Sequence, residues 1–207
     1  LVDTRIDAAH LPKIRDARAA ARAAAWAAGA APPAGSPLYI DIDATLVIDH
    51  SDNKQNAAPT WKKTFGHHPL LAFLDRPEIA GGEALAGLLR KGNAGSNTAA
   101  DHITVLEQAL ASLPADRRPT PITEGGPAVV VRCDSAGATH KFATACRDRG
   151  VGFSFGFPVD ARIWDAVDTL NLAGGWYPAI DAGGEIRDGA WVAEATVSGA
   201  ATVAWAD

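Results

Sequence analysis

The chain has 207 residues, of which 47% are hydrophobic and 21% are charged, and its formal net charge is −5. This length and composition predict a globular protein with one substantial core and room for a small appendage. The negative charge argues against a basic nucleic-acid surface over the whole chain, but leaves a local patch open. No apolar run reaches the roughly 20 residues that a membrane helix needs, so no membrane partner is expected.

The cysteine pattern and the lack of a signal peptide predict an intracellular protein. Cys133 and Cys146 fall in or just after expected core elements and form no framework of the secreted type. We therefore expect reduced thiols and a cytoplasmic location. The sequence contains no methionine and opens on Leu1, which predicts a fragment of a longer product.

The N-terminal region, residues 1–36, is expected to form a helical segment and a linker. Residues 3–30 are rich in alanine and arginine, and Gly29 with the prolines that follow is typical of a helix end. Arg15, Arg18 and Arg22 recur on roughly one face of this helix. They fit either a solvated face or a contact with phosphate.

Two apolar runs that end in aspartate are the most informative feature of the chain. Residues 38–46 carry Asp41 and Asp43, and residues 129–137 carry Asp134. Each pattern predicts a buried strand that delivers a carboxylate to a sheet edge. Converging carboxylates are usually held by a divalent cation that prefers oxygen ligands, most simply Mg²⁺. The runs therefore predict a metal site, and Asp41 is a further candidate because it shares the strand face of Asp43.

The elements around these runs predict a mixed sheet. Residues 60–65 and 70–74 are apolar and too close together for a crossover helix, so we expect them to pair antiparallel with the first acidic strand. Residues 99–113 and 138–149 have helical spacing, and residues 151–157 indicate a fifth strand. The order β-β-β-α-β-α-β, with acids on strands one and four, predicts a ribonuclease H-like α/β fold in which those two strands are neighbours.

Beyond this sheet, the pattern changes. A helix is expected around Trp164, Val167 and Leu170, followed by glycine turns that flank short strands and by a strand over residues 191–197.

Four segments of the chain resemble the DDE-type transposases of bacterial insertion sequences. They match that family in order and spacing: residues 41–47 (DIDATLV), 59–71 (PTWKKTFGHHPLL), 89–102 (LRKGNAGSNTAADH) and 132–137 (RCDSAG). The resemblance implies a ribonuclease H-like core that cleaves and joins DNA at insertion-sequence ends, with two Mg²⁺ or Mn²⁺ ions and a homo-oligomer when intact. Its first two catalytic and metal-binding acids fall on Asp43 and Asp134.

The third acid that the resemblance implies, a glutamate on a helix beyond an inserted β-rich region, has no counterpart in the sequence. Glu194 is the last glutamate and falls in an expected strand, so it is a poor substitute. The resemblance divides the chain into 1–36, a catalytic core over 37–157, and the start of the inserted region over 158–207. It implies a chain that is unable to catalyse alone, because two ions roughly 4 Å apart need all three acids.

Two other functions stay open. A transposase remnant without catalysis would keep the fold and act only by binding. The pattern Asp41-x-Asp43-x-Thr45-Leu46 also matches the opening motif of haloacid-dehalogenase-like phosphatases, with Asp41 as nucleophile and Asp43 as general acid or base. Those enzymes need a lysine and a further acidic pair on parallel strands, with helices between successive strands. Residues 49–74 predict a meander instead, and residues 134–137 lack the second acid.

The histidines and Arg132 carry weaker predictions. His67 and His68 follow a turn, and adjacent side chains on an extended segment diverge, so a shared metal site is not expected. His50 follows the first acidic strand and could contact DNA phosphate or cap a turn. His102 and His140 lie near helix starts and could reach the active cleft, but surface exposure is expected. Arg132 precedes the second acid and is expected to pair with a carboxylate or to contact phosphate.

Overall fold

The computed structural model describes residues 7–51, 54, 56–79, 82–96, 98–122, 126–181 and 183–195. The chain divides into two compact units, Leu1–Gly156 and Phe157–Asp207. None of the helices within the described residues is both long and apolar enough to cross a bilayer.

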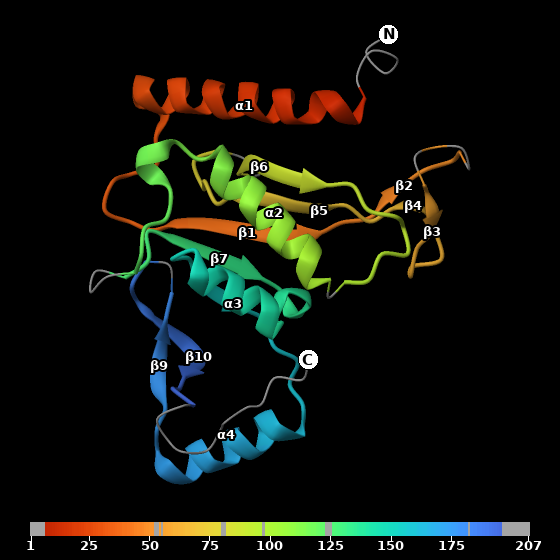
Figure 1. Cartoon of the computed structure of the whole chain (residues 1–207). Helices are drawn as coiled ribbons and strands as arrows, with labels where there is room; N and C mark the ends of the chain where they lie inside the picture. The colour runs from red at the N-terminus through yellow and green to blue at the C-terminus, as the bar shows by residue number, and fades with distance from the viewer. Residues whose placement is uncertain are drawn as a thin grey trace. The chain divides into compact units, whose positions relative to one another are not determined.

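A five-stranded mixed sheet forms the centre of the first unit, in the order β6-β5-β1-β7-β8 (Figure 1). β1 (Leu38–Ala44) pairs antiparallel with β5 (Leu70–Leu74), which pairs antiparallel with β6 (Glu83–Leu88). On its other side β1 pairs parallel with β7 (Val129–Cys133), and β7 pairs parallel with β8 (Gly152–Phe155). The two strands that end in aspartate are therefore parallel neighbours, which confirms the prediction.

Two helices, α2 (Ala99–Ser112) and α3 (His140–Asp148), cover the same face of this sheet (Figure 1). Helix α2 packs on β1, β5 and β6, and α3 packs on α2 and β8. Thr139 caps α3, because its hydroxyl oxygen accepts a hydrogen bond of 3.2 Å from the backbone nitrogen of Phe142. The order β1-β5-β6-α2-β7-α3-β8 is the predicted order of a ribonuclease H-like fold.

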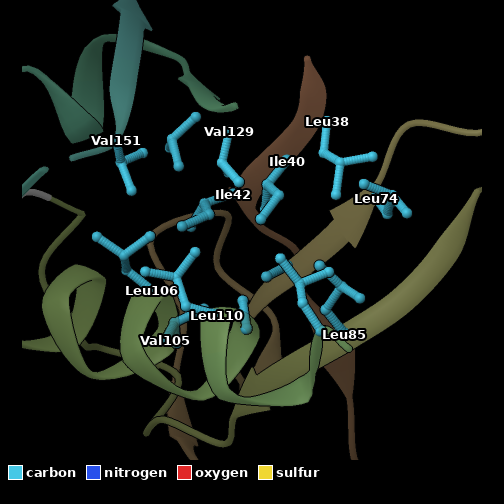
Figure 2. Close-up of a cluster of buried hydrophobic side chains, with 14 of the residues drawn as sticks. Leu38, Ile40, Ile42, Leu74, Leu85, Val105, Leu106, Leu110, Val129 and Val151 are labelled. Atoms are coloured by element: carbon cyan, nitrogen blue, oxygen red, sulfur yellow. The ribbon is translucent and has the colours of Figure 1, made fainter. Parts of the chain in front are cut away.

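Aliphatic side chains between the sheet and α2 form the core (Figure 2). Side chains alternate along β1, so Ile40 and Ile42 are buried in the core while Tyr39 and Asp43 are exposed on the opposite face. The strands and α2 contribute the other members of the cluster in Figure 2, among them Leu38, Leu74, Leu85, Val105, Leu106, Leu110, Val129 and Val151. The pleat of β1 therefore separates the core from the acids.

The two cysteines are free thiols, Cys133 at the end of β7 and Cys146 on α3. Burial raises the pKa of both thiols above its ordinary value, to about 12 for Cys146. Both thiols therefore stay protonated at neutral pH and serve as packing groups.

Helix α1 (Leu11–Ala25) lies beside the edge strand β6 (Figure 1). Nη2 of Arg18 and Nη2 of Arg22 both donate hydrogen bonds to the carbonyl oxygen of Ala84 in β6, at 3.0 and 2.8 Å. Arg22 is buried, donates to the carbonyl oxygen of Ser112 at 3.0 Å, and forms an ion pair with Glu83. The expected solvated face is therefore wrong for Arg22, whereas Arg18 is exposed while it donates to the carbonyl oxygen of an edge strand.

The predicted helix over residues 3–30 is present from residue 8, and residues 3–6 lie outside the described residues. A short 3₁₀ turn, Ala8–His10, leads into α1, and one wide π-turn, Trp26–Ala30, follows it. The helical path ends at Gly29, whose φ of +103° favours glycine. Two other 3₁₀ turns are Ala115–Arg117 and Ser135–Gly137.

Residues 60–65 do not join the main sheet, so this part of the predicted pairing is wrong. Three short strands, β2 (Val47–Ile48), β3 (Ala58–Pro59) and β4 (Phe65–His67), form a separate sheet in the order β2-β4-β3, and residues 60–64 turn between β3 and β4. The third antiparallel strand of the main sheet is β6. Its alanines and glycine, in place of β-branched residues, gave no strand signal.

The second unit contains α4 (Ala161–Ala173) and a hairpin of β9 (Tyr177–Ile180) and β10 (Ile186–Val192). Asp160 caps α4, because its carboxylate accepts hydrogen bonds from two backbone nitrogens of the first turn. The predicted helix and the glycine turns are confirmed. The strand predicted over residues 191–197 ends at residue 192, and residues 196 and 197 lie outside the described residues.

Candidate active site

Asp43 and Asp134 lie next to each other where β1 and β7 end. The parallel register pairs Ile42 with Cys133, and the next residue on each strand is the aspartate. Both aspartates line one cavity of about 500 Å³. The fold therefore brings together the two acids that the sequence singles out.

Short backbone hydrogen bonds orient both carboxylates. Oδ1 of Asp43 accepts from the backbone nitrogen of Ala44 at 2.7 Å, and Oδ1 of Asp134 accepts from that of Ala136 at 2.9 Å. Among the described residues neither carboxylate forms an ion pair. Two neighbouring carboxylates without a cation repel each other, so a divalent cation between them would lower the electrostatic free energy.

Asp41 has a different environment, although it lies on the same face of β1. Nε and Nη2 of Arg132 each donate to one oxygen of Asp41 at 2.7 Å, and Nη2 also donates to Asp75 at 2.7 Å. The hydrogen bonds that Arg132 donates to Asp41 are the main reason that the pKa of Arg132 is raised. Arg132 thus pairs with carboxylates, one of the two contacts expected from the sequence. Asp41 does not line the cavity of Asp43 and Asp134.

Beyond β1, Leu70 of β5 and Ala136 of the turn after β7, four segments contribute to the cavity wall. The start of α2 contributes His102, the turn before β4 contributes Trp61, and the residue after β4 is His68. The loop after β6 contributes Asn93, Ala94, Gly95 and Ser96. No pattern in the sequence placed Trp61 at the site. The glycines, asparagines and serine of residues 92–97 indicate a loop, but not that it lines the site.

His102 is buried, which contradicts the exposure expected near a helix start. It is 2% exposed, its ring packs at a centroid distance of 5.2 Å from Phe142, and its Nδ1 donates to the carbonyl oxygen of Thr98 at 3.0 Å. Burial is the main cause that lowers the pKa of His102. The ring is therefore neutral at pH 7, and a neutral imidazole fits a buried wall beside two acids.

Arg90 anchors the loop that forms this wall. It is 6% exposed, and its Nε donates to the carbonyl oxygen of His68 at 2.9 Å. Its Nη1 donates to the carbonyl oxygen of Gly95 at 3.1 Å and to Asp101 of α2 at 3.3 Å. One buried guanidinium thereby ties the loop to both β4 and α2.

Of the other residues that the sequence singled out, only His68 is among the described residues that line the cavity. His67 is buried on β4, and its Nε2 has no partner among the described residues, whereas the adjacent His68 lines the cavity. His50 and His140 are exposed. Glu194 follows β10 in the second unit and is exposed.

The chemistry of the two acids fits a divalent metal in part. Carboxylate oxygens are the ligands that Mg²⁺ prefers, and no described cationic side chain pairs with Asp43 or Asp134. In the part of the chain that the structure describes, no three His, Cys, Asp or Glu side chains are grouped to hold a metal ion. The described residues therefore offer two ligands rather than a closed metal site.

A mixed sheet in this strand order, with two helices on one face, belongs to the ribonuclease H-like class of folds. Residues 4–205 match the family model described as Transposase DDE domain group 1, and the chain belongs to this family. Transposases of the family act on DNA and generally use divalent metal ions. A comparison with curated protein sequences gives no match.

Proposed function

We propose that residues 37–157 form the catalytic core for metal-dependent cleavage and strand transfer of DNA at the ends of an insertion sequence. The observation that supports it best is the register of β1 and β7, which places Asp43 and Asp134 side by side at one cavity. Residues 158–207 would then begin an inserted region. The family supports DNA as the partner.

In this proposal Asp43 and Asp134 hold Mg²⁺ or Mn²⁺, and a third carboxylate completes a two-metal site. When bound, the ions neutralise charge on the reacting phosphodiester and activate the attacking hydroxyl or water. The protein's own part is to hold both carboxylates by their backbone hydrogen bonds and to shape the cavity with the loop that Arg90 anchors. A homo-oligomer and a cytoplasmic location belong to the same proposal, because an element with two ends is cut and joined on cellular DNA.

Two alternative functions have weaker support. A remnant that only binds would share the fold and the cavity, and differs in having no activity even when a third acid is supplied. A haloacid-dehalogenase-like phosphatase would need Asp41 as a free nucleophile. The two hydrogen bonds from Arg132 hold that carboxylate, and it lies outside the cavity, so the structure disfavours this function.

Calorimetric titration with Mn²⁺ tests the site. Asp43→Asn and Asp134→Asn should each weaken binding by at least about tenfold, because each removes an anionic oxygen ligand while the amide oxygen keeps the backbone hydrogen bond. Asp49→Asn is a matched control, because its carboxylate also accepts a backbone hydrogen bond, from Ser51 at 3.1 Å, but does not line the cavity.

Asp41→Asn should also leave Mn²⁺ binding unchanged. If Asp41→Asn or Asp49→Asn weakens binding as much as Asp43→Asn does, the assignment of the metal to the cavity is wrong.

A further inference from the structure

The most exposed large side chain at the cavity of Asp43 and Asp134 is a tryptophan. Trp61 is 70% exposed although it contributes to the cavity wall. The ammonium group of Lys62 lies 5.0 Å from the centroid of its ring. An aromatic ring of this size normally buries its surface in a core or against a binding partner. Because the ring borders the proposed active site, a partner bound at that site would explain why Trp61 is exposed in the free protein.

The turn that carries Trp61 is held by hydrogen bonds at its base. The backbone nitrogen of Thr60 donates to the carbonyl oxygen of Thr64 at 2.7 Å, and the two threonine hydroxyls are 2.6 Å apart. The backbone nitrogen of Lys63 donates to the carbonyl oxygen of Thr60 at 3.0 Å, and Lys63 itself has a φ of +61°. A non-glycine residue with a positive φ is strained, so the hydrogen bonds of the turn must impose this backbone conformation on Lys63. The ring is thus presented on a fixed support.

The small sheet on either side of the Trp61 turn also packs against the loop that lines the cavity. A Cβ at Gly92 would lie 2.2 Å from the carbonyl oxygen of Ala58 in β3 and 2.7 Å from that of Gly66 in β4. The loop after β6 therefore packs directly on the small sheet. The same loop lines the cavity of Asp43 and Asp134, so backbone packing joins the turn of Trp61 to a wall of that cavity.

The carboxylates of this cavity and the lysines beside Trp61 fit the binding of a DNA strand. Asp43 and Asp134 repel a phosphodiester backbone, so a DNA strand that enters the cavity needs cations beside them. Lys62 and Lys63 are exposed and follow Trp61 directly. An aromatic face with adjacent cations is how proteins bind unpaired nucleotides, because every base has a face that stacks and every nucleotide has a phosphate.

We propose that the ring of Trp61 stacks on an unpaired base of the DNA strand whose phosphodiester enters the cavity, and that Lys62 contacts the phosphate beside that base. This rests on the proposed function for the cavity, and assigns to the turn over residues 60–64 the recognition of single-stranded DNA next to the reacting bond. Base pairs inside a duplex are covered on both faces by their neighbours and cannot stack on the ring, so the turn favours strands that are open at that point.

The test is binding of fluorescein-labelled DNA to the full 207-residue chain in EDTA, measured by fluorescence anisotropy. The probes are a single strand of 12 nucleotides and the blunt duplex of the same sequence. Trp61→Ala should weaken binding of the single strand by about 5- to 150-fold and leave duplex binding unchanged, because one stacked base is lost. Trp61→Phe should retain most of the affinity, since its ring still stacks.

Three controls sharpen this result. Trp164→Ala removes another exposed tryptophan, 59% exposed on α4 of the second unit, and should have no effect. Lys62→Ala should reduce the dependence of log Kd on log salt by about 0.7, the value for one phosphate contact on a single strand. Circular dichroism of each variant should match the parent, because these side chains are exposed.

Several outcomes would overturn the inference: no single-strand binding by the parent chain, equal binding by Trp61→Ala, or an equal loss in Trp164→Ala. The proposed function fails separately. Because DNA binding is measured in EDTA, Asp43→Asn should not weaken single-strand binding even where it abolishes Mn²⁺ binding in the calorimetric titration. A chain that binds no Mn²⁺ but shows the Trp61 effect would keep the stacking site and reject the metal site.

Discussion

Asp41 and Asp43 are two residues apart on one face of β1, yet their surroundings assign them different roles. Asp41 is held by Arg132 on the neighbouring strand, whereas Asp43 lines the cavity beside Asp134 and forms no ion pair with a described residue. The sequence shows the alternation that gives both acids one face. It does not show that Arg132, 91 positions later, is placed by the parallel register directly opposite Asp41. Which aspartate faces the cavity was therefore a matter of pairing between strands rather than of local pattern.

His102 shows a second consequence of burial at the residue scale. Burial lowers the pKa of its imidazole from the ordinary value of 6.5, and the charge of Arg90 lowers it too. The hydrogen bond to Thr98 and the charges of Asp101 and Asp134 raise the same pKa, but the net direction is down. The unfolded chain therefore binds this proton more readily than the folded chain does.

The stability that neutral His102 contributes should be present above about pH 6.5 and lost as the pH falls below it. In urea denaturation at pH 7.5 and pH 5.5, His102→Asn should lower the free energy of unfolding at both values and lose less of it on acidification than the parent chain. His50→Asn, at an exposed site, should keep the parent's difference between the two pH values. A parent-like pH dependence in His102→Asn would show that another group causes it.

At the scale of elements, strong local patterns were predictable and weak ones were not. The runs of β1 and β7 are β-branched and apolar, and α2 and α3 have helical spacing, so their positions followed from sequence. β6 was missed, because alanine and glycine have low strand propensity. Its pairing with β5, which the local sequence does not reveal, holds it in the sheet. Residues 60–65 have strand-like composition but turn, because hydrogen bonds between Thr60 and Thr64 close the segment.

The packing of the loop after β6 against the small sheet can be tested with two glycines of that loop. In Gly92→Ala the new Cβ would lie 2.2 Å from a backbone oxygen, so the backbone must move. We expect a loss of about 1–3 kcal/mol in the free energy of unfolding. In Gly95→Ala the nearest atom is 3.6 Å away, an ordinary contact, and stability should be unchanged or rise by up to about 1 kcal/mol. Equal melting temperatures for the two variants would contradict this packing.

The attachment of α1 to the sheet depends on Arg22 rather than on apolar contacts alone. Arg22→Ala would leave Glu83 and the carbonyl oxygens of Ala84 and Ser112 without the guanidinium. Because the site is largely buried, we expect a loss of about 3–5 kcal/mol in the free energy of unfolding, measured with urea. Arg15→Ala, on the same face of α1, should change it by less than about 0.5 kcal/mol. Similar losses in both variants would show that the arginines act only by packing along the helix.

At the scale of the whole molecule, the two units differ in how much they bury. The first unit has a continuous core between its sheet and helices. Of the described residues of the second unit, Ala166 and Leu170 are buried, and its hairpin exposes Tyr177, Ile180, Ile186 and Trp191. A two-stranded hairpin with so little buried surface is marginally stable on its own. Both acids of the proposed site, Asp43 and Asp134, therefore lie in the unit that has a continuous core.

That site should nevertheless be inactive in this 207-residue chain. In the described residues, Asp43 and Asp134 supply two carboxylates at the cavity, and no third ligand is grouped with them. One of two metal ions would then lack a protein ligand, so the attacking and leaving oxygens could not both be neutralised. With Mg²⁺ or Mn²⁺, we expect no nicking of supercoiled plasmid and no joining of labelled insertion-sequence ends. Nicking by the purified chain that is lost in Asp134→Asn would show that a third acid is already present, and Glu194→Gln would be the first variant to test. Nicking that persists in Asp134→Asn would instead indicate a contaminating nuclease, because the proposed chemistry depends on that carboxylate.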